Sequence, residues 1–515
     1  MAKVLQNIFN PGVDEVAQTY TIESWHVSQS VDAFTAATDY DISVSGSITL
    51  TGQMTNGDGT NIATGSFSHA EGASTIASGS YSHAEGFFTQ AIGDFSHAEG
   101  SGTVASGSQS HAEGSGTQAN GQSSHAEGSY TTSTGFASHA EGFSNTSTGD
   151  YSHAEGTSTE TTGLYSHAEG NGSQAIGEGS HAEGYTTQAS GAYSHAEGVS
   201  TIASGSYSHV EGFFTQAIGD SSHAEGDNTI ASGSYSHAEG SGTISSGLYS
   251  HVEGENTITT ANFSHAEGSY TTANGYASHA EGLSTTANGD YSHAEGQNTT
   301  ANGDGSHTEG YGTIVTGTYS HAEGAETKAI GNYSHAEGAY TTSSGDYSHT
   351  EGYNTKTSGS YSHAEGSNTK ASGSYSHTEG NTTIAIGDYS HAEGYQTTST
   401  GYASHAEGFK AIAIGNYSHA EGNTTIASGS YQHVSGQYNT QGDTTSLFIV
   451  GNGTSNGNRK DAFKVRMSGS IVMPTTQSAA PTWTGVDGEI VPATVGGVYR
   501  LYMYMDGAWR SSSFA

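Results

Sequence analysis

The amino-acid sequence predicts an all-β solenoid, in which short strands stack along a rod. From His69 to His433 a histidine returns every 14 residues, which gives 27 rungs without an insertion or a deletion. A coil whose turns stack on one another needs this constancy, because one extra residue would misalign every later column. Two glycines in each period disfavour helix, since each costs about 1 kcal/mol relative to alanine in a helix interior.

The columns of the repeat are nearly constant when positions are counted from the ladder histidine. Ser precedes the histidine in every rung except the last, Ala, Val or Thr follows it, and Glu stands at +2 in 26 of 27 rungs. Gly occupies +3 and, apart from Ala261, +10, while Thr is usual at +6 and a small residue at +8. Tyr or Phe stands at −2 in 18 of the 26 positions between rungs. We interpret these columns as two short strands joined by glycine turns.

Alternation along a strand assigns each column to a side of the coil. In the first strand Ser, Ala and Gly share one side, and Tyr, His and Glu share the other. In the second strand Thr, the small residue and Gly share one side, and variable residues share the other. The small residues should fill a thin interior, with a layer every roughly 4.8 Å and a rod of roughly 130 Å. Because such an interior buries little apolar surface, we expect the constant Tyr–His–Glu side to pack against another copy of the chain.

We therefore predict an intersubunit ladder in which His and Glu form charge-assisted hydrogen bonds across a seam. Its representative residues are His69, Glu71, His83, Glu85, His97, Glu99, His153, Glu155, His237, Glu239, His321, Glu323, His391 and Glu393. If Glu stabilises the protonated imidazole, the pKa of the histidines rises and the shaft is more stable at pH 6 than at pH 9. If burial dominates, the sign reverses.

Composition excludes several classes of partner. Acidic residues outnumber Lys and Arg by 50 to 11, for a formal net charge of −39, which argues against binding to nucleic acid or to an anionic membrane. The chain has no Cys, so it has no disulfide and no thiolate metal site. No run of about 20 apolar residues predicts membrane insertion. No signal peptide follows Met1, so we expect synthesis in a cytoplasm.

The repeated His–Glu pair raises the question of chemistry. His beside Glu can perform acid–base catalysis, but a catalytic pair needs one distinctive pocket, and equivalent rungs offer none. We predict neither an enzyme nor a cofactor. Three histidines, one from each of three chains, could bind Zn²⁺ with carboxylates beside them, and this remains the alternative to a purely structural pair. Ice binding is disfavoured because the constant Thr column is expected to point inward.

Aromatic residues also appear sporadically after the glycine at +3. They could stack on sugars, but we favour packing within the turn. These residues are Phe87, Phe88, Tyr130, Tyr185, Phe213, Phe214, Tyr270, Tyr340 and Tyr353.

The two ends differ from the repeats. Residues 1–60 form a predicted attachment region, in which "DISVSGSITLTG" (41–52) alternates like a strand, and residues 61–436 form the shaft. Residues 437–475 form a β junction, where 446–473 reads as two or three strands, and residues 476–515 form a C-terminal tip. Receptor contact is predicted for tip residues that could equally form the core of the tip: Trp483, Tyr499, Arg500, Tyr502, Trp509 and Arg510.

The 14-residue unit resembles the head repeat of YadA-type trimeric adhesins. "YSHAEG" (81–86) and "STIASG" (74–79) occupy the places of that family's N-S-V-A-I-G and S/T-x-A-x-G strands, and the resemblance extends over 61–436. It implies a left-handed parallel β-roll and a homotrimer. In the family the Val and Ile places line the trimer seam, whereas here they hold His and Glu, so the resemblance implies a polar seam.

Both ends resemble pieces of tailed-phage fibre and appendage proteins. "DYDISVSGSITLTG" is similar to an N-terminal lead-in, and "VGNGTSNGNRKDAFKV" is similar to the junction before a fibre tip. The resemblance implies a virion fibre on tail or head, displayed on the particle exterior. Its N-terminal region would bind other virion proteins, and its tip a host receptor such as a glycan. The alternatives are a bacterial-type trimeric surface adhesin and a passive rod; we find no signal peptide, coiled-coil stalk or membrane barrel, which favours the virion.

Overall fold

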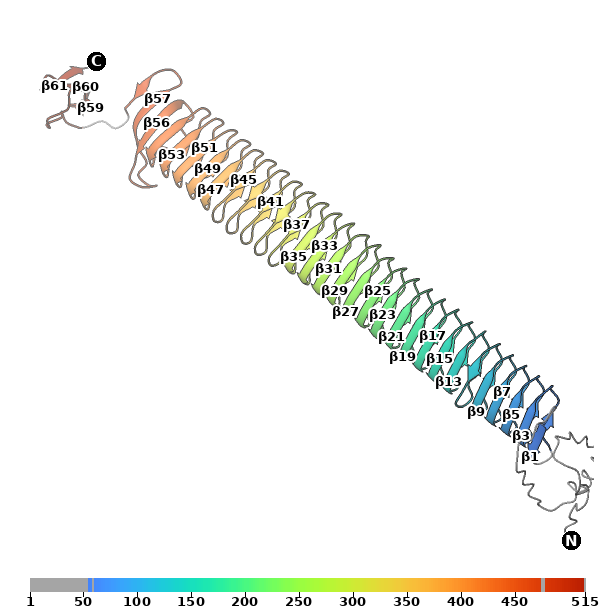
Figure 1. The fold of residues 1–515 in the computed structure, drawn as a ribbon. Helices are drawn as coiled ribbons and strands as arrows, with labels where there is room; N and C mark the ends of the chain where they lie inside the picture. The colour runs from blue at the N-terminus through green and yellow to red at the C-terminus, as the bar shows by residue number, and fades with distance from the viewer. Residues whose placement is uncertain (1–53, 58–59, 474–477, 514–515) are drawn as a thin grey trace, which may run out of the picture.

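A computed structural model describes residues 54–57, 60–473 and 478–513, which form strands, turns and bends without a helix. Figure 1 shows the strands of the repeats stacked in sequence order along a rod. The predicted all-β fold and parallel solenoid are therefore confirmed. The strand predicted at 41–52 lies outside the described residues. Within them, no helix is long and apolar enough to cross a membrane.

One side of the solenoid is a parallel sheet made by the odd-numbered strands. From β3 (His69–Ala73) to β55 (His433–Gln437), each of these strands begins at a ladder histidine. Most have five residues; β11 (His125–Ala126) and the odd strands from β37 (His307–Thr308) to β45 (His363–Ala364) have two. Neighbouring strands pair in register, so that every ladder histidine lies beside the histidine of the next rung. The sheet begins with β1 (Met54–Gly57), which pairs with β3.

The opposite side is a second parallel sheet made by the even-numbered strands. These run from β2 (Ile62–Ala63) to β54 (Ile426–Ala427), each with two residues at +7 and +8. Backbone hydrogen bonds join each rung to the next in both sheets, as His69 N–H donates to Ser82 O (2.9 Å) and Ile76 N–H to Thr89 O (2.9 Å). The repeat is thus held mainly by a continuous backbone ladder.

The interior between the two sheets contains the small constant residues. Ala70, Thr75 and Ala77 are fully buried, and Ser68 is 1% exposed. The buried serines satisfy their hydroxyls locally, as when Ser82 Oγ donates to Gly79 O at 2.7 Å. The predicted thin interior of Ser, Ala and Thr is confirmed. It offers little apolar area per layer, so the stability of each rung depends on its neighbours.

The glycine at +10 lies in a corner of the solenoid, as predicted, since Ser82 N–H donates to Gly79 O across that turn, but both corners also place side-chain-bearing residues in the left-handed backbone region. In the first full repeat Ser74 (+5) has φ 57° and Tyr81 (−2) has φ 58°, and most other rungs repeat both corners. The residue at −2 therefore lies in the turn before the strand and not on the strand face. This conformation costs an L-residue roughly 1–2 kcal/mol, so each Tyr there requires a compensating interaction.

The two glycine columns are required by the close approach of successive rungs. A Cβ on Gly79 (+10) would lie 1.9 Å from Gly93 O. At +3, inside the odd strands, Gly100 has φ +109°, and a Cβ there would lie 2.1 Å from Gly114 O. Any larger residue would push apart two layers that are joined by hydrogen bonds.

Gly100→Ala is expected to destabilise its own and the neighbouring rungs by roughly 2–4 kcal/mol, because both the contact and the φ are unfavourable. Gly102→Ala is the matched control: Gly102 has φ +67° with nothing within 4 Å of a Cβ, at a position where other rungs hold Ser, Phe or Tyr. Hydrogen exchange of peptides covering 97–119 should become faster in the first variant than in the second, which carries the cost of the positive φ without the contact. Equal protection in both variants would contradict the packing explanation.

The C-terminal end of the solenoid is closed by a short meander. Strand β56 (Ser446–Asn452) continues the first sheet in parallel with β55, and β57 (Asp461–Arg466) and β58 (Ile471–Val472) follow antiparallel. The strands predicted in 446–473 are confirmed. Gln432, which replaces the usual Ser, is buried; it accepts from Ser428 N–H (2.8 Å) and donates to Asp443 O (2.8 Å) and Ser446 O (2.9 Å).

A separate three-stranded antiparallel sheet follows along the chain. It consists of β59 (Ile490–Val495), β60 (Val498–Met505) and β61 (Ala508–Ser513). Val491, Ala493 and Tyr502 form its small core, with Val495 and Trp509 packed against them.

Candidate functional site

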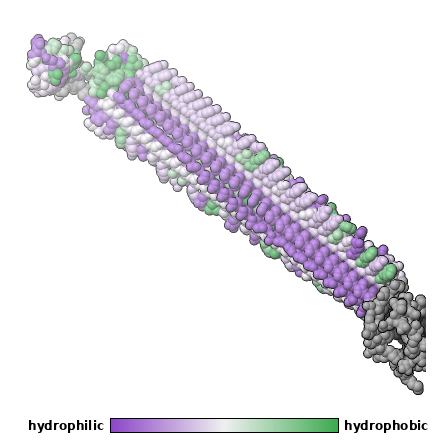
Figure 2. Space-filling model, in the orientation of Figure 1, coloured by the Kyte–Doolittle hydropathy of each residue, from purple (hydrophilic) through white to green (hydrophobic). Residues whose placement is uncertain are grey.

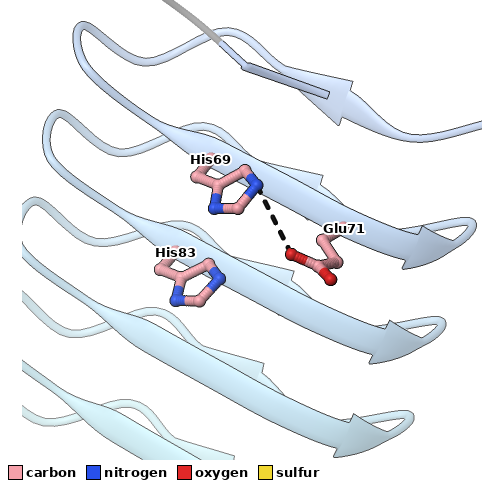
Figure 3. A group of neighbouring side chains, drawn as sticks. All are labelled: His69, Glu71 and His83. Carbon is pink, nitrogen blue, oxygen red and sulfur yellow. Dashed lines mark ion pairs between the residues drawn. The ribbon is translucent and has the colours of Figure 1, made fainter. Parts of the chain in front are cut away.

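The outward side of the first sheet carries one His and one Glu from each rung, and we call it the histidine–glutamate face. Residues two apart on a strand point to the same side, so the face follows directly from the S-H-A-E-G pattern. Figure 3 shows His69 and Glu71 side by side on β3, with His83 on the next strand. Figure 2 shows unbroken hydrophilic rows along the shaft.

The histidine rings form a continuous stack. The His69 and His83 ring centroids lie 4.8 Å apart with an interplanar angle of 3°, and this geometry recurs along the shaft. The stack ends against Phe448, whose ring centroid lies 5.2 Å from that of His433. In three pairs of successive histidines the rings are tilted instead of parallel: His209–His223 by 52°, His251–His265 by 34° and His419–His433 by 52°.

The distances between His and Glu on this face are mostly longer than those of strong hydrogen bonds. His69 Nε2 lies 3.6 Å from Glu71 Oε2, and such separations are typical along the shaft. Hydrogen-bond distances occur near the C-terminal end, where His419 Nε2 is 3.1 Å from Glu407 Oε1 and His433 Nε2 is 3.3 Å from Glu421 Oε1. The structure thus brings the predicted ladder residues together on one face. Their pairing across subunits stays a prediction.

Most ladder histidines have a buried Nε2 without a hydrogen bond in the described residues, among them His69, His237 and His391. An unsatisfied buried polar atom costs about 1–3 kcal/mol. Repeated over most rungs, this is an unusual surplus of unmet hydrogen-bonding capacity on a single face.

Burial lowers the pKa of many ladder histidines, among them His97 and His237, as expected for the alternative in which burial dominates. Burial lowers the pKa of His139 and of His391 to about 4, and the neighbouring histidines shift both in the same direction. Nearby glutamates oppose the shift without overcoming it, as Glu127 does at His139. The expected rise in pKa is therefore wrong for the single chain, because each imidazole meets two other imidazoles as well as carboxylates. These histidines are neutral at pH 7.

The glutamates of neighbouring rungs share protons. Hydrogen bonds with Glu407 and Glu379 raise the pKa of Glu393 to about 7, and the same contacts help to lower the pKa of both partners. A second example is Glu183, whose hydrogen bond with Glu169 raises its pKa to about 7. Along Glu127–Glu197 the carboxylates and the glycine backbone line a shallow open groove. Carboxylates are thus crowded beside neutral imidazoles.

An exposed column of aromatic rings runs beside this face at −2. Rings from Tyr319 to Tyr431 are in continuous contact, for example Tyr347–Tyr361 at 4.9 Å and 0°. Where −2 is Ala403, Tyr402 at −3 supplies the ring through edge contacts with Tyr389 and Tyr417. The aromatic residues at position −2 of the repeat do not by themselves predict this continuous column. The sequence does contain its missing members, because an aromatic residue stands at −3 wherever −2 is Ala.

Several of the sporadic aromatics at +4 and +5 contact another aromatic ring, as Tyr340 contacts Tyr353 edge-on at 5.8 Å. Phe87 packs edge-on against Phe88 at 4.3 Å, and Phe213 packs in the same way against Phe214. Both pairs are also partly exposed.

The candidate receptor contacts in the C-terminal sheet have different exposures. Tyr502 is buried in the core, so it has little surface to offer a partner. Trp509 packs against Trp483 and Tyr504, and its Nε1 donates to Trp483 O at 2.8 Å. Tyr499 is 65% exposed, and the Arg510 side chain is 62% exposed. Arg500, on the same side of β60 as Tyr502, is half-buried.

A family model described as the YadA head domain repeat (2 copies) matches six segments of the solenoid: residues 84–110, 217–236, 266–292, 294–320, 379–404 and 406–431. These six segments of the solenoid are therefore similar to YadA head repeats. No curated protein matches the chain.

Proposed function

We propose that the chain forms the shaft and tip of an adhesin-like homotrimeric fibre. The observation that carries the proposal is the exposed aromatic column beside the histidine–glutamate face. Tyr347, Tyr361 and Tyr375 hold an unfavourable positive φ and leave about half of each side chain exposed. Packing of this column against a second copy would compensate the backbone strain and would bury apolar area that the thin interior lacks.

The proposed setting is a bacteriophage virion, on tail or head, with host-surface contact as the function. Support comes from the similarity of both ends to phage fibre proteins and from the small C-terminal sheet, which exposes Tyr499 and Arg510. The high negative charge keeps such a rod soluble and disfavours nonspecific adsorption to nucleic acid. We propose that residues 1–60 attach the fibre to the particle.

The native mass of the full chain should equal three chains. Replacing Tyr347, Tyr361 and Tyr375 by asparagine, which accepts positive φ, should weaken the trimer while leaving the turns intact. Asparagine at Tyr130, Tyr270 and Tyr340, which also have positive φ but occupy the sporadic +5 column, is the matched control and should leave the mass unchanged. A monomeric parent chain, or equal effects of the two variants, would contradict the proposal.

Host contact is tested with the same full-length protein. Labelled trimers should bind host cells, and Tyr499→Ser with Arg510→Ser should reduce binding without changing the mass. A trimer that binds no cells would instead support a passive rod, and labelling of intact virions would show whether the fibre belongs to the particle.

A further inference from the structure

We propose that the histidine–glutamate face binds divalent transition-metal ions such as Zn²⁺, Ni²⁺ or Co²⁺. Each ion would be held by two histidines of successive rungs and one glutamate, all from the same chain. This goes beyond the proposed fibre, because neither a trimer nor host contact requires a metal. It also differs from a site made by one histidine from each of three chains.

The first observation is the arrangement of ligand atoms. In groups such as His69–Glu71–His83 and His139–Glu141–His153, one ligand atom from each residue lies within 4.8 Å of the other two. Figure 3 shows the first group, with both imidazoles and the carboxylate on the same side of the sheet. Two imidazole nitrogens with one carboxylate oxygen form a donor set that Zn²⁺ uses in proteins, with water completing the tetrahedron.

The second observation is the unmet bonding capacity of Nε2. This nitrogen is buried in most rungs and has no hydrogen-bond partner in the described residues, although a carboxylate oxygen lies only 3.5–3.9 Å away in many of them. A neutral imidazole with an unused nitrogen is the form that coordinates a metal. The stacked carboxylates add negative charge, which a cation between the columns would balance.

The third observation concerns the adjustment that binding requires. Two nitrogens on one tetrahedral Zn²⁺ lie about 3.3 Å apart, given bonds of 2.0–2.1 Å, so parallel rings at 4.8 Å must tilt toward each other. The stack already accommodates such tilts, at His209–His223 and His251–His265. Because each ion uses two histidines, full occupancy corresponds to roughly one ion for every two rungs. Mg²⁺ and Ca²⁺ prefer all-oxygen sites and should not compete.

Metal content of the full-length chain, purified without a polyhistidine tag, tests the proposal. After treatment with EDTA and dialysis, Zn²⁺ or Co²⁺ is added and unbound metal is removed. We expect several ions per chain, approaching one per two rungs, with Co²⁺ absorption bands typical of nitrogen coordination and no displacement by excess Mg²⁺. Zn²⁺ should also raise the melting temperature, as a ligand of the native state does. Less than one ion per chain would overturn the proposal.

Two matched variants locate the ions. The first replaces six consecutive ladder histidines by glutamine: His321, His335, His349, His363, His377 and His391. The second introduces glutamine at +7 of the same rungs, on the opposite sheet, where other rungs already have Gln: Lys328, Thr342, Lys356, Lys370, Ile384 and Thr398. The first should lose about a fifth to a quarter of the ions, in proportion to the histidines removed, and the second none. Equal losses would overturn the assignment to this face; if the first variant does not fold, the metal count of the parent chain still decides.

Discussion

The melting temperature of the metal-free shaft is expected to fall as the pH is lowered from about 7 to about 4. Burial and neighbouring imidazoles lower the pKa of many ladder histidines, among them His237 and His321, and to about 4 at His139 and His391. Between the unfolded pKa of about 6.5 and these values, the unfolded chain binds protons that the folded chain does not. The contribution of these histidines to the free energy of unfolding is therefore complete above pH 6.5, and it is lost as the pH falls through the pKa of the folded state.

The glutamates modify this trend without reversing it. The pKa of Glu183 and of Glu393 is raised to about 7, so each contributes stability below pH 4.5 that is lost as the pH rises toward 7. Their partners Glu169 and Glu407 have lowered pKa values and act in the opposite direction, together with the histidines. Solvent screening keeps each contribution below the roughly 1.4 kcal/mol of one full pKa unit, but contributions from many rungs add.

Thermal unfolding followed by circular dichroism, in EDTA and at constant ionic strength, measures this dependence. The melting temperature should be several degrees lower at pH 5 than at pH 8, and the difference should shrink in the variant with six histidines replaced by glutamine. The corresponding +7 variant, with its ladder intact, should keep the full difference. A higher melting temperature at pH 5 would show that pairing of the histidines with Glu outweighs burial.

The repeat period determined most of what could be predicted about the shaft. Constant spacing implies stacked rungs in register, and alternation assigns Ser, Ala and Thr to the interior, as the burial of Ala70 and Thr75 confirms. Alternation also placed His69 and Glu71 on one outward face, where the structure has them. These properties follow from backbone geometry that does not depend on the identity of distant residues.

Other features depend on distances that a sequence does not contain. Tyr disfavours positive φ, so a turn at Tyr81 could not be inferred from its intrinsic preference. The reason for glycine at Gly100 is a carbonyl oxygen 14 residues later in the chain. The sign of the histidine pKa shift depends on how burial and imidazole repulsion compare with the attraction of Glu, and only the arrangement of several rungs decides it. Likewise, the position of Tyr502 in a core follows only from the fold of its sheet.

Lys464→Met is expected to destabilise the C-terminal end of the solenoid by about 3–5 kcal/mol, the usual consequence of leaving buried charges without their partner. Lys464 Nζ lies 3.0 Å from Asp443 Oδ2 and 2.6 Å from Asp461 Oδ2, and all three side chains are 12% exposed or less. Although burial alone would raise it, hydrogen bonds from Lys464, Thr445 and Ser446 hold the pKa of Asp443 well below its usual value. Without the lysine, the buried carboxylates of Asp443 and Asp461 would have no cation between them.

The effect should be local, because a solenoid is held together rung by rung and opens most easily at an unprotected end. Hydrogen exchange should become faster in peptides from 419–452 and remain unchanged in peptides from 181–251. Arg510→Ala is the control: its ion pair with Asp506 is 3.8 Å long, with side chains 62% and 87% exposed, and its loss should cost at most about 1 kcal/mol. Unchanged exchange at 419–452 in Lys464→Met would mean that the hydrogen bonds of Gln432 and the pairing of β56 with β55 close the solenoid without the ion pair.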